Sequence, residues 1–308
     1  MTTHTDRPRG PAGAETVPGA RRRSNLAPYL FISPFYLGFI AFKVVPIVFS
    51  LYLSLANWNG GGAIEFAGLA NFQALFADAR FWNAFQVTLI ITGVCTIVGT
   101  IGALALAVFL ERVVDWLASL LRVIFFLPSV TSVVVIVYIW RQLYSTDYGY
   151  FNTVLTQLGY ARLSWLTDTH LQVFALLIML IWAGLGWDAL IITSGLRAIP
   201  TEFYDAAKVD GAGGWAEFWN ITLPLLRPTL TFVLVTGVIF LWGIFAESQL
   251  LTGGGQMHES ETIALYLYNA GFRYHKFGYA SAMAVVLSLL MFVSSWLNFR
   301  FVQTEVEY

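Results

Sequence analysis

The sequence predicts an all-α integral membrane protein, and its composition and its apolar segments both lead to that class. Of its 308 residues, 57% are hydrophobic and only 11% are charged, and the mean hydropathy is +0.68. Soluble domains carry roughly 25% charged residues. A membrane β-barrel would show segments of about ten residues with alternating polarity, and the sequence has no such segments.

Six apolar segments are long enough, or nearly long enough, to cross a bilayer. A hydrocarbon core of about 30 Å needs about 20 apolar residues in a helix, and helices satisfy their own backbone in lipid. The third and fifth segments are short without their flanking residues. The predicted spans are 29–55, 87–110, 123–140, 171–196, 229–246 and 279–299.

The segments outside these spans predict one membrane domain with a tail. Residues 1–25 are rich in Pro, Gly, Thr and Arg and have no apolar periodicity, so we expect a disordered N-terminal tail. The apolar run after Arg23 is too long for a secretory signal, which favours an uncleaved first helix. No connection is long enough for a sizeable soluble domain, so residues 26–308 form a single six-helix domain.

The distribution of Lys and Arg predicts that both termini are cytoplasmic, because cytoplasmic loops carry the excess of positive charge. With the N-terminus inside, eleven of these residues lie inside and five outside, and Lys43 falls within the first span. The inside group is Arg7, Arg9, Arg21, Arg22, Arg23, Arg112, Arg122, Arg197, Lys208, Arg227 and Arg300, and the outside group is Arg80, Arg141, Arg162, Arg273 and Lys276. The connection at about 197–228 then faces the cytoplasm.

This cytoplasmic connection predicts a compact helix–turn–helix. A short helix begins near Thr201, which can cap it, and its first turn carries Asp205 among its acidic residues. Gly211 stands where that helix must end, since glycine adopts left-handed dihedrals without steric cost. A second helix then places Trp215, Phe218, Trp219 and Thr222 on one face. An ordinary amphipathic loop at the membrane surface is the alternative.

The spacing within the connection resembles the cytoplasmic EAA signature of binding-protein-dependent ABC importer permeases. That signature reads E-A-A, three residues, G, nine residues and I-x-L-P, and every spacing matches. The matching residues are Asp205, Ala206, Ala207, Gly211, Ile221, Leu223 and Pro224, with the frequently overlapping Asp-Gly-Ala at Asp210, Gly211 and Ala212. The resemblance implies that they dock an ATPase subunit; Asp205 replaces the usual Glu, so the basic partner of this carboxylate is open.

Further pieces resemble the sugar-permease branch, of the type of the first permease subunit of maltose and glycerol-3-phosphate importers. They are "FAGLANFQALFADARFWNAFQVTL", "LRVIFFLPSV", "LLTGGGQ" and "FGYASAMAVVL". The resemblance implies a type I importer permease in a prokaryotic cell membrane that moves a sugar or sugar-like solute. It implies as partners a second homologous permease, two copies of a cytoplasmic ATPase and an extracytoplasmic solute-binding protein.

We expect this chain to be no enzyme and to hold no cofactor or metal. It has no G-x-x-x-x-G-K-[ST] phosphate loop, so ATP and Mg²⁺ are expected on the partner ATPase. No basic patch with aromatic residues points to nucleic acid. The run at 258–261, "HESE", is interpreted as a solvated loop, "TGGGQM" at 252–257 as a turn or a contact for the binding protein, and Cys95 as apolar packing.

A sugar site needs aromatic faces and a few polar groups. The resemblance aligns Trp182 and Gly184 with a Trp-x-Gly of similar sugar permeases, where this part of the helix lines the solute site. Trp187 and Trp242 are further candidates, with packing or a place in the interfacial belt as the alternative.

Charged residues inside spans are candidate functional sites, and they support a rival interpretation. An ion-coupled secondary transporter would use Lys43, Asp188 and Glu247 as its relay, and an integral-membrane enzyme is a third possibility. Neither rival needs the helix–turn–helix, and no pair of inverted repeats emerges from the spans.

Overall fold

The structure, a computed structural model, describes residues 27–302 and divides into two units, Met1–Ile47 and Val48–Tyr308. The predicted tail at 1–25 lies outside the described residues. Within the first unit are α1 (Ala27–Phe39), the π-helical turn η1 (Ile40–Val44) and the start of α2 (Val45–Ser54), which continues into the second unit. The stretch Pro28–Ser54 is long and apolar enough to cross a membrane, which matches the first predicted span.

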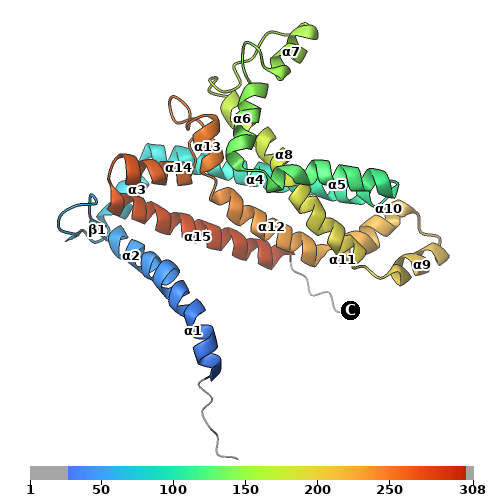
Figure 1. Cartoon of the computed structure of the whole chain (residues 1–308), viewed down its shortest axis with the longest axis horizontal. Coiled ribbons are helices and arrows are strands. Elements are labelled where there is room, and N and C mark those ends of the chain that lie inside the picture. Colours follow the sequence, from blue (N-terminus) through green and yellow to red (C-terminus); the bar gives the residue numbers. More distant parts are fainter. Residues whose placement is uncertain (1–26, 303–308) are drawn as a thin grey trace, which may run out of the picture. The chain divides into compact units, whose positions relative to one another are not determined.

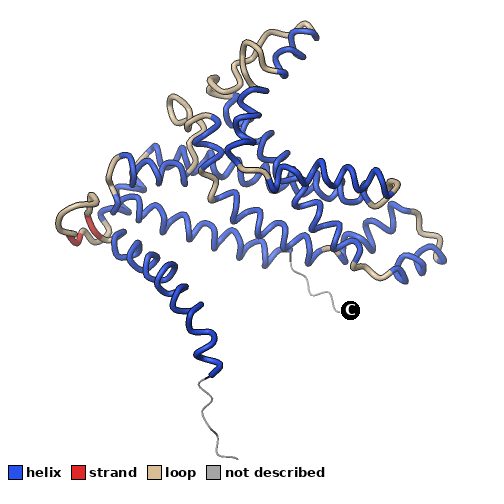
Figure 2. The backbone as a smooth tube through the Cα atoms, in the orientation of Figure 1, coloured by secondary structure: helices blue, strands red, loops and turns tan. Residues whose placement is uncertain are grey.

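The second unit consists of helices and one small antiparallel ribbon (Figure 1, Figure 2). The ribbon pairs β1 (Ala56–Asn57) with β2 (Glu65–Phe66). The helices are α3 (Ala70–Ala77), α4 (Ala79–Leu110), α5 (Asp115–Val130), α6 (Val133–Leu143), α7 (Tyr150–Gln157), α8 (Leu171–Arg197), α9 (Thr201–Val209), α10 (Gly214–Glu217), η2 (Phe218–Thr222), α11 (Leu223–Leu225), α12 (Arg227–Trp242), α13 (Ala246–Leu251), α14 (Ile263–Tyr268), η3 (Asn269–Arg273) and α15 (Phe277–Val302).

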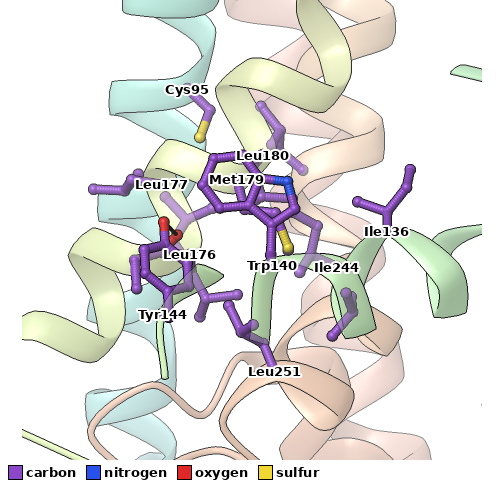
Figure 3. Close-up of a cluster of buried hydrophobic side chains, with 14 of the residues drawn as sticks. Cys95, Ile136, Trp140, Tyr144, Leu176, Leu177, Met179, Leu180, Ile244 and Leu251 are labelled. Carbon is purple, nitrogen blue, oxygen red and sulfur yellow. Dashed lines mark hydrogen bonds between the residues drawn. The ribbon is translucent and has the colours of Figure 1, made fainter. Parts of the chain in front are cut away.

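The long helices α4, α8, α12 and α15 form the body of this unit. Helix α4 packs against α8 and α12, and α12 packs against α15. A buried cluster joins α4, α6, α8 and α13 around Trp140 and Tyr144 (Figure 3). The Tyr144 hydroxyl donates to the carbonyl of Ala175 at 2.9 Å, so this buried phenol has the partner it needs. Cys95 lies in the same cluster with a free, buried thiol, in agreement with a packing role.

Four of the described helical stretches are long and apolar enough to span a membrane, and two further spans exist only if each of two bent pairs counts as one. The predicted third span, 123–140, is wrong as a straight helix, because α5 and α6 meet at 106°. The fifth span, predicted at 229–246, is observed as α12 at Arg227–Trp242, so it begins and ends earlier than predicted. A bend of 63° separates it from the preceding segment Gly214–Leu225. The count of six spans therefore stays a prediction.

The bend between α5 and α6 has a local cause. Pro128 stands in the last turn of α5 and has no N–H to donate within the helix. Thr131 and Ser132 follow in extended conformations, with ψ of 142° and 134°. The Thr131 hydroxyl donates to the carbonyl of Leu127 at 2.7 Å and satisfies one acceptor at the broken end.

Candidate functional site

The helix–turn–helix expected at about 197–228 is formed by α9, α10, η2 and α11, and it lies beside the C-terminal ends of α4 and α8. A pocket of about 200 Å³ is lined by residues of the connection and of those ends. Glu111 and Leu196 line the pocket from α4 and α8, and Tyr204, Phe218 and Thr222 line it from the connection. Tyr204 and Leu223 also pack against a buried cluster that contains residues of α4 and α8, so the connection rests on both long helices.

Helix α9 ends at Gly211 in a Schellman motif. Gly211 has a φ of +79°, the left-handed conformation predicted for it. The Ala212 N–H donates to the carbonyl of Ala207 at 2.9 Å, and the Gly211 N–H donates to the carbonyl of Lys208 at 3.1 Å. These are the two bonds that define the motif. A Cβ added at Gly211 would meet no atom of the described residues within 4 Å, so the backbone conformation is what favours glycine here.

The first half of the signature forms an exposed surface. Asp205, Ala206, Asp210 and Gly211 are exposed, and Ala207 and Ala212 are partly buried. The Asp205 carboxylate accepts from Lys208 Nζ at 3.3 Å, one turn later on α9. This surface ion pair is screened by solvent and contributes little stability, so the carboxylate remains available to an external cation.

The expectation that Thr201 caps α9 is wrong. Pro200 occupies the N-cap position, no side chain caps the helix, and Thr201 is its first residue. Proline in extended conformation delivers the chain to the helix without an N–H that needs a partner.

The second helix of the connection differs from the predicted amphipathic helix. It changes from α10 to the π-helical turn η2, and this turn moves Thr222 away from the tryptophans. Trp215 is 75% exposed and Trp219 is also exposed, whereas Thr222 is buried. The Thr222 hydroxyl lies 3.0 Å from the Tyr204 hydroxyl of α9. One side of this helix therefore faces α9 and the other leaves an aromatic surface open.

The second half of the signature joins the connection to the body. Ile221, Leu223 and Pro224 are partly buried. Leu226, two residues after Pro224, is fully buried in a cluster with Ile192 of α8 and with Ile199, which follows the end of α8. The sequence I-x-L-P thus carries the chain from the exposed surface into the packed start of α12.

The structure does not bring the four tryptophan and glycine candidates for a solute site together. Trp182 is 39% exposed and its ring contacts Trp140, with the centroids 5.5 Å apart. Gly184 and Trp187 are exposed on another side of α8, since Trp182 and Trp187 are about 140° apart around a helix. Trp242 is only 3% exposed and packs against Phe85 in a separate cluster.

The residues of the rival relay are also scattered. Lys43 lies in η1 of the first unit, Asp188 in α8 and Glu247 in α13. Among the described residues, no ion pair joins any two of them. Burial raises the pKa of the Glu247 carboxyl above its usual value.

At the opposite end of α4, the structure shows an ion pair that the sequence analysis missed. Glu261 was interpreted as part of a solvated loop, but it is only 1% exposed. Its carboxylate accepts from Arg80 Nε and Nη2 of α4, at 2.7 Å each, and from Asn269 Nδ2 at 2.8 Å. His258 Nδ1 lies 3.1 Å from the same carboxylate. Arg80 and Glu261 are 181 residues apart along the chain, so nothing in the sequence signalled this contact beyond the two opposite charges.

A second carboxylate extends this polar network. Asp78 caps α4 by accepting from the Arg80 N–H at 2.9 Å, and it also accepts from the hydroxyls of Tyr266 and Tyr279. Burial raises the pKa of Asp78, but the hydrogen bonds from the two tyrosines and the backbone outweigh burial and lower it. Burial and the bond to Asp78 raise the pKa of Tyr266 to about 12. The start of α4 is therefore fixed to α14 and α15.

The glycine run at 252–257 forms a turn, as one of its two interpretations predicted. Gly253, Gly254 and Gly255 all have positive φ, between 68° and 90°. Behind this turn the Ser260 hydroxyl donates to Gln172 Oε1 of α8 at 2.8 Å. Among the described residues, no three His, Cys, Asp or Glu side chains come together to hold a metal ion.

Comparisons with known proteins agree with this arrangement. The family model of the "binding-protein-dependent transport system inner membrane component" matches residues 99–304. The chain is 33% identical over 297 residues to the probable ABC transporter permease protein YesP of Bacillus subtilis, covering 94% of each chain. It is 31% identical over 295 residues to the arabinooligosaccharides transport system permease protein AraP of the same organism, covering 92% of this chain and 94% of that one.

The fold also matches a solved structure. A chain of a bacterial alginate ABC transporter, in complex with an alginate pentasaccharide-bound periplasmic protein, superposes with a TM-score of 0.82 at 22% identity, covering 92% of this chain and 98% of that one. The chain therefore belongs to the family of inner-membrane components of binding-protein-dependent transport systems, and it is a multi-pass permease subunit of an ABC importer.

Proposed function

We propose that this permease subunit imports a sugar or a sugar-like solute, which an extracytoplasmic binding protein delivers and a separate ATPase drives across the membrane. The relative AraP is named for arabinooligosaccharides, and the similar solved transporter was crystallised with its periplasmic protein. A second, similar permease completes the pathway. ATP and Mg²⁺ bind to two copies of the ATPase. The rival interpretation as a secondary transporter is not supported by these similar proteins.

The exposed surface around the Gly211 turn is the observation that carries the coupling proposal. It presents a carboxylate at Asp205, small side chains at Ala206 and Ala207, and a turn with free space around it. Small residues let another backbone approach closely, and a left-handed glycine fixes the direction in which the chain leaves the helix. Such a surface suits docking against a cleft on the ATPase.

The same connection is able to pass a displacement to the membrane helices. Tyr204 and Thr222 join its two helices, and Leu226 anchors its end in the cluster with Ile192 and Ile199. Packed cores shift as bodies rather than deform continuously. Closure of the ATPase dimer on this surface would therefore move α8 and α12 together, and alternating access would follow from that movement.

The proposed orientation places this surface in the cytoplasm and both termini inside. The Lys/Arg distribution supports it. Along the chain, α4 and α8 both end beside the connection, while the Arg80–Glu261 ion pair lies at the start of α4. The polar network at Arg80 then faces the side from which the binding protein delivers solute.

The proposed solute contacts lie on α8. Gly184 and Trp187 share an exposed side of this helix, and Trp182 is partly exposed beside Trp140. Aromatic faces and a close backbone approach at glycine suit a sugar ring. Trp242 would have no direct solute contact, because it is buried against Phe85 in a separate cluster.

Purification of the tagged assembly, followed by ATPase assays, tests the proposal. Hydrolysis should be stimulated by the binding protein together with a mono-, di- or oligosaccharide from a solute panel, and uptake should require ATP. If uptake instead follows an imposed proton gradient in the absence of ATP, the proposal is wrong.

A further inference from the structure

A groove of about 270 Å³ lies between α4, α5 and α8, near the C-terminal end of α4. Its walls are apolar: Leu106 from α4, Val123 and Phe126 from α5, and Ala189 and Leu190 from α8. None of the solute-site candidates Trp182, Gly184 and Trp187 lines it. This groove has no role in the function proposed above.

Two buried polar atoms at one end of the groove lack hydrogen-bond partners among the described residues. Thr193 is only 5% exposed and lines the groove, and its hydroxyl has no hydrogen-bond partner among the described residues. The Nε of Arg122, also at the groove, is buried and has no partner there either. An unsatisfied buried donor costs free energy comparable to a lost hydrogen bond. Two of them in one groove indicate that an acceptor from outside the chain belongs there.

This end of the groove also carries excess positive charge. The Glu111 Oε1 atom accepts from Arg122 Nη2 at 3.2 Å and from Arg197 Nε at 3.0 Å. One carboxylate thus serves two guanidinium groups, and Arg112 is adjacent in sequence. Asp115 is the nearest acidic residue on α5, two turns before Arg122. The end of the groove therefore favours an anionic ligand.

We propose that this groove binds an anionic phospholipid, with an acyl chain along its apolar walls and the phosphate oxygens at Arg122 and Thr193. Basic pockets between transmembrane helices on the cytoplasmic side suit anionic lipid headgroups. A phosphate oxygen accepts from both a guanidinium Nε and a hydroxyl. A sugar would leave most of its hydroxyls unpaired against Leu106, Phe126 and Leu190, and a free phosphate would leave the apolar walls empty.

The lipid would hold α5 against its two neighbours. At Gly186 the backbone of α8 approaches the carbonyl of Phe125 so closely that no side chain fits. The groove lies beside this contact, and at the groove Arg122 of α5 pairs with Glu111. An acyl chain there would fill the gap between the helices, and the phosphate would accept a hydrogen bond from the unpartnered Nε of Arg122. The bound lipid then stabilises the helix ends on which the connection rests.

Native mass spectrometry of the full chain, purified in mild detergent with its co-expressed partner subunits, tests the proposal. After delipidation, phosphatidylglycerol or phosphatidylcholine is added back. The wild type should retain phosphatidylglycerol in preference, and Arg122→Gln should lower its retention about fivefold, as expected for one cation near an anionic headgroup. Arg300→Gln removes a cation near the end of α15 and is the matched control, which should leave retention unchanged.

Two further variants separate the groove from the charge alone. Leu190→Trp fills the groove from a partly exposed position and should abolish retention with Arg122 intact. Thr193→Val removes the unpartnered hydroxyl: it should leave the melting temperature of delipidated protein unchanged or higher, but should reduce the increase that phosphatidylglycerol produces. Equal retention of both lipids by the wild type, or full retention in Arg122→Gln and Leu190→Trp, would overturn the proposal.

Inorganic phosphate and the solute panel serve as competitors in the same experiment. Neither should displace the lipid; displacement by a sugar would assign the groove to the solute pathway and contradict the proposal. Lipid retention is measured without transport, so the lipid proposal can be tested even if the coupling proposal is wrong. Only the assignment to the cytoplasmic leaflet rests on the proposed orientation.

Discussion

The Tyr204 hydroxyl of α9 lies 3.0 Å from the Thr222 hydroxyl of η2. This side-chain hydrogen bond connects the two helices of the connection. Thr222 is buried, and its hydroxyl also lies 3.4 Å from the carbonyl of Glu217. The bond joins two segments that are 18 residues apart, so it holds α9 and η2 as one body.

Tyr204→Phe should therefore loosen the connection without exposing a new surface. Removing one neutral hydrogen bond costs about 1 kcal/mol. We expect the ATPase to co-purify in normal amount, while the ratio of solute-stimulated to basal hydrolysis falls severalfold. Tyr160→Phe alters an exposed tyrosine elsewhere and is the control. An unchanged ratio in Tyr204→Phe would show that this bond does not transmit movement.

Glu261→Gln should destabilise the start of α4. It leaves the Arg80 guanidinium without its anion and replaces two charge-assisted hydrogen bonds, at a cost of about 2 kcal/mol. The melting temperature of the purified subunit measures this cost. Glu65→Gln, at an exposed position, should have no effect. Equal melting temperatures for wild type and Glu261→Gln would show that the ion pair adds nothing to stability.

Trp182→Ala should weaken solute binding and leave assembly intact. Loss of an aromatic face costs about 1 kcal/mol, so the KM for uptake should rise several-fold, up to about tenfold. Trp182→Phe keeps a ring beside Trp140 and should retain most of the activity. Trp116→Ala, at an exposed tryptophan of α5, is the control for general effects. Normal uptake in Trp182→Ala would mean that Trp182 only packs.

Single cysteines should reveal the orientation. They are placed at Ala12, Gln73, Gly213 and Met257 in a Cys95→Ala background, since the native thiol is buried in an apolar cluster. An impermeant thiol reagent on intact cells should label Gln73 and Met257 and spare Ala12 and Gly213. Labelling at position 213 as strong as that at position 73 would contradict the proposed topology.

The sequence was sufficient for features that depend on local residues. Gly211 was predicted to be left-handed from its place after a short helix, and its φ of +79° confirms this. Helices α8 and α15 match their predicted spans to within three residues, because long apolar runs leave few alternatives in lipid. Helix α4 ends at the predicted residue but begins at Ala79, eight residues earlier than predicted. The resemblance at Asp205, Gly211 and Pro224 pointed to the family from the sequence alone.

Features that depend on distant contacts were missed. The break after Pro128 was missed too, although its cause is local, because the apolar run across it resembled one span. The result is that α5 packs against α8 while α6 packs against α13. Glu261 appeared to be solvated because nothing nearby in sequence signals Arg80. The π-helical turn η2 shifts Thr222 out of the α-helical register that the spacing predicted.

The central claim is that the turn at Gly211 is the surface on which the ATPase docks. A β-branched residue in a left-handed conformation is strained by about 1–2 kcal/mol, and a Cβ added at Gly211 would meet no atom of the described residues within 4 Å. Gly211→Val should therefore reach the membrane normally but distort the exposed turn, with Gly211→Ala intermediate and Asp205→Ala milder.

The measurement is co-purification of the ATPase with Gly211→Val, together with solute-stimulated ATP hydrolysis, at matched amounts of permease in the membrane. The account predicts that Gly211→Val loses the ATPase, or keeps it without stimulation by solute. Wild-type values for both quantities would contradict the claim that this surface couples ATP hydrolysis to transport.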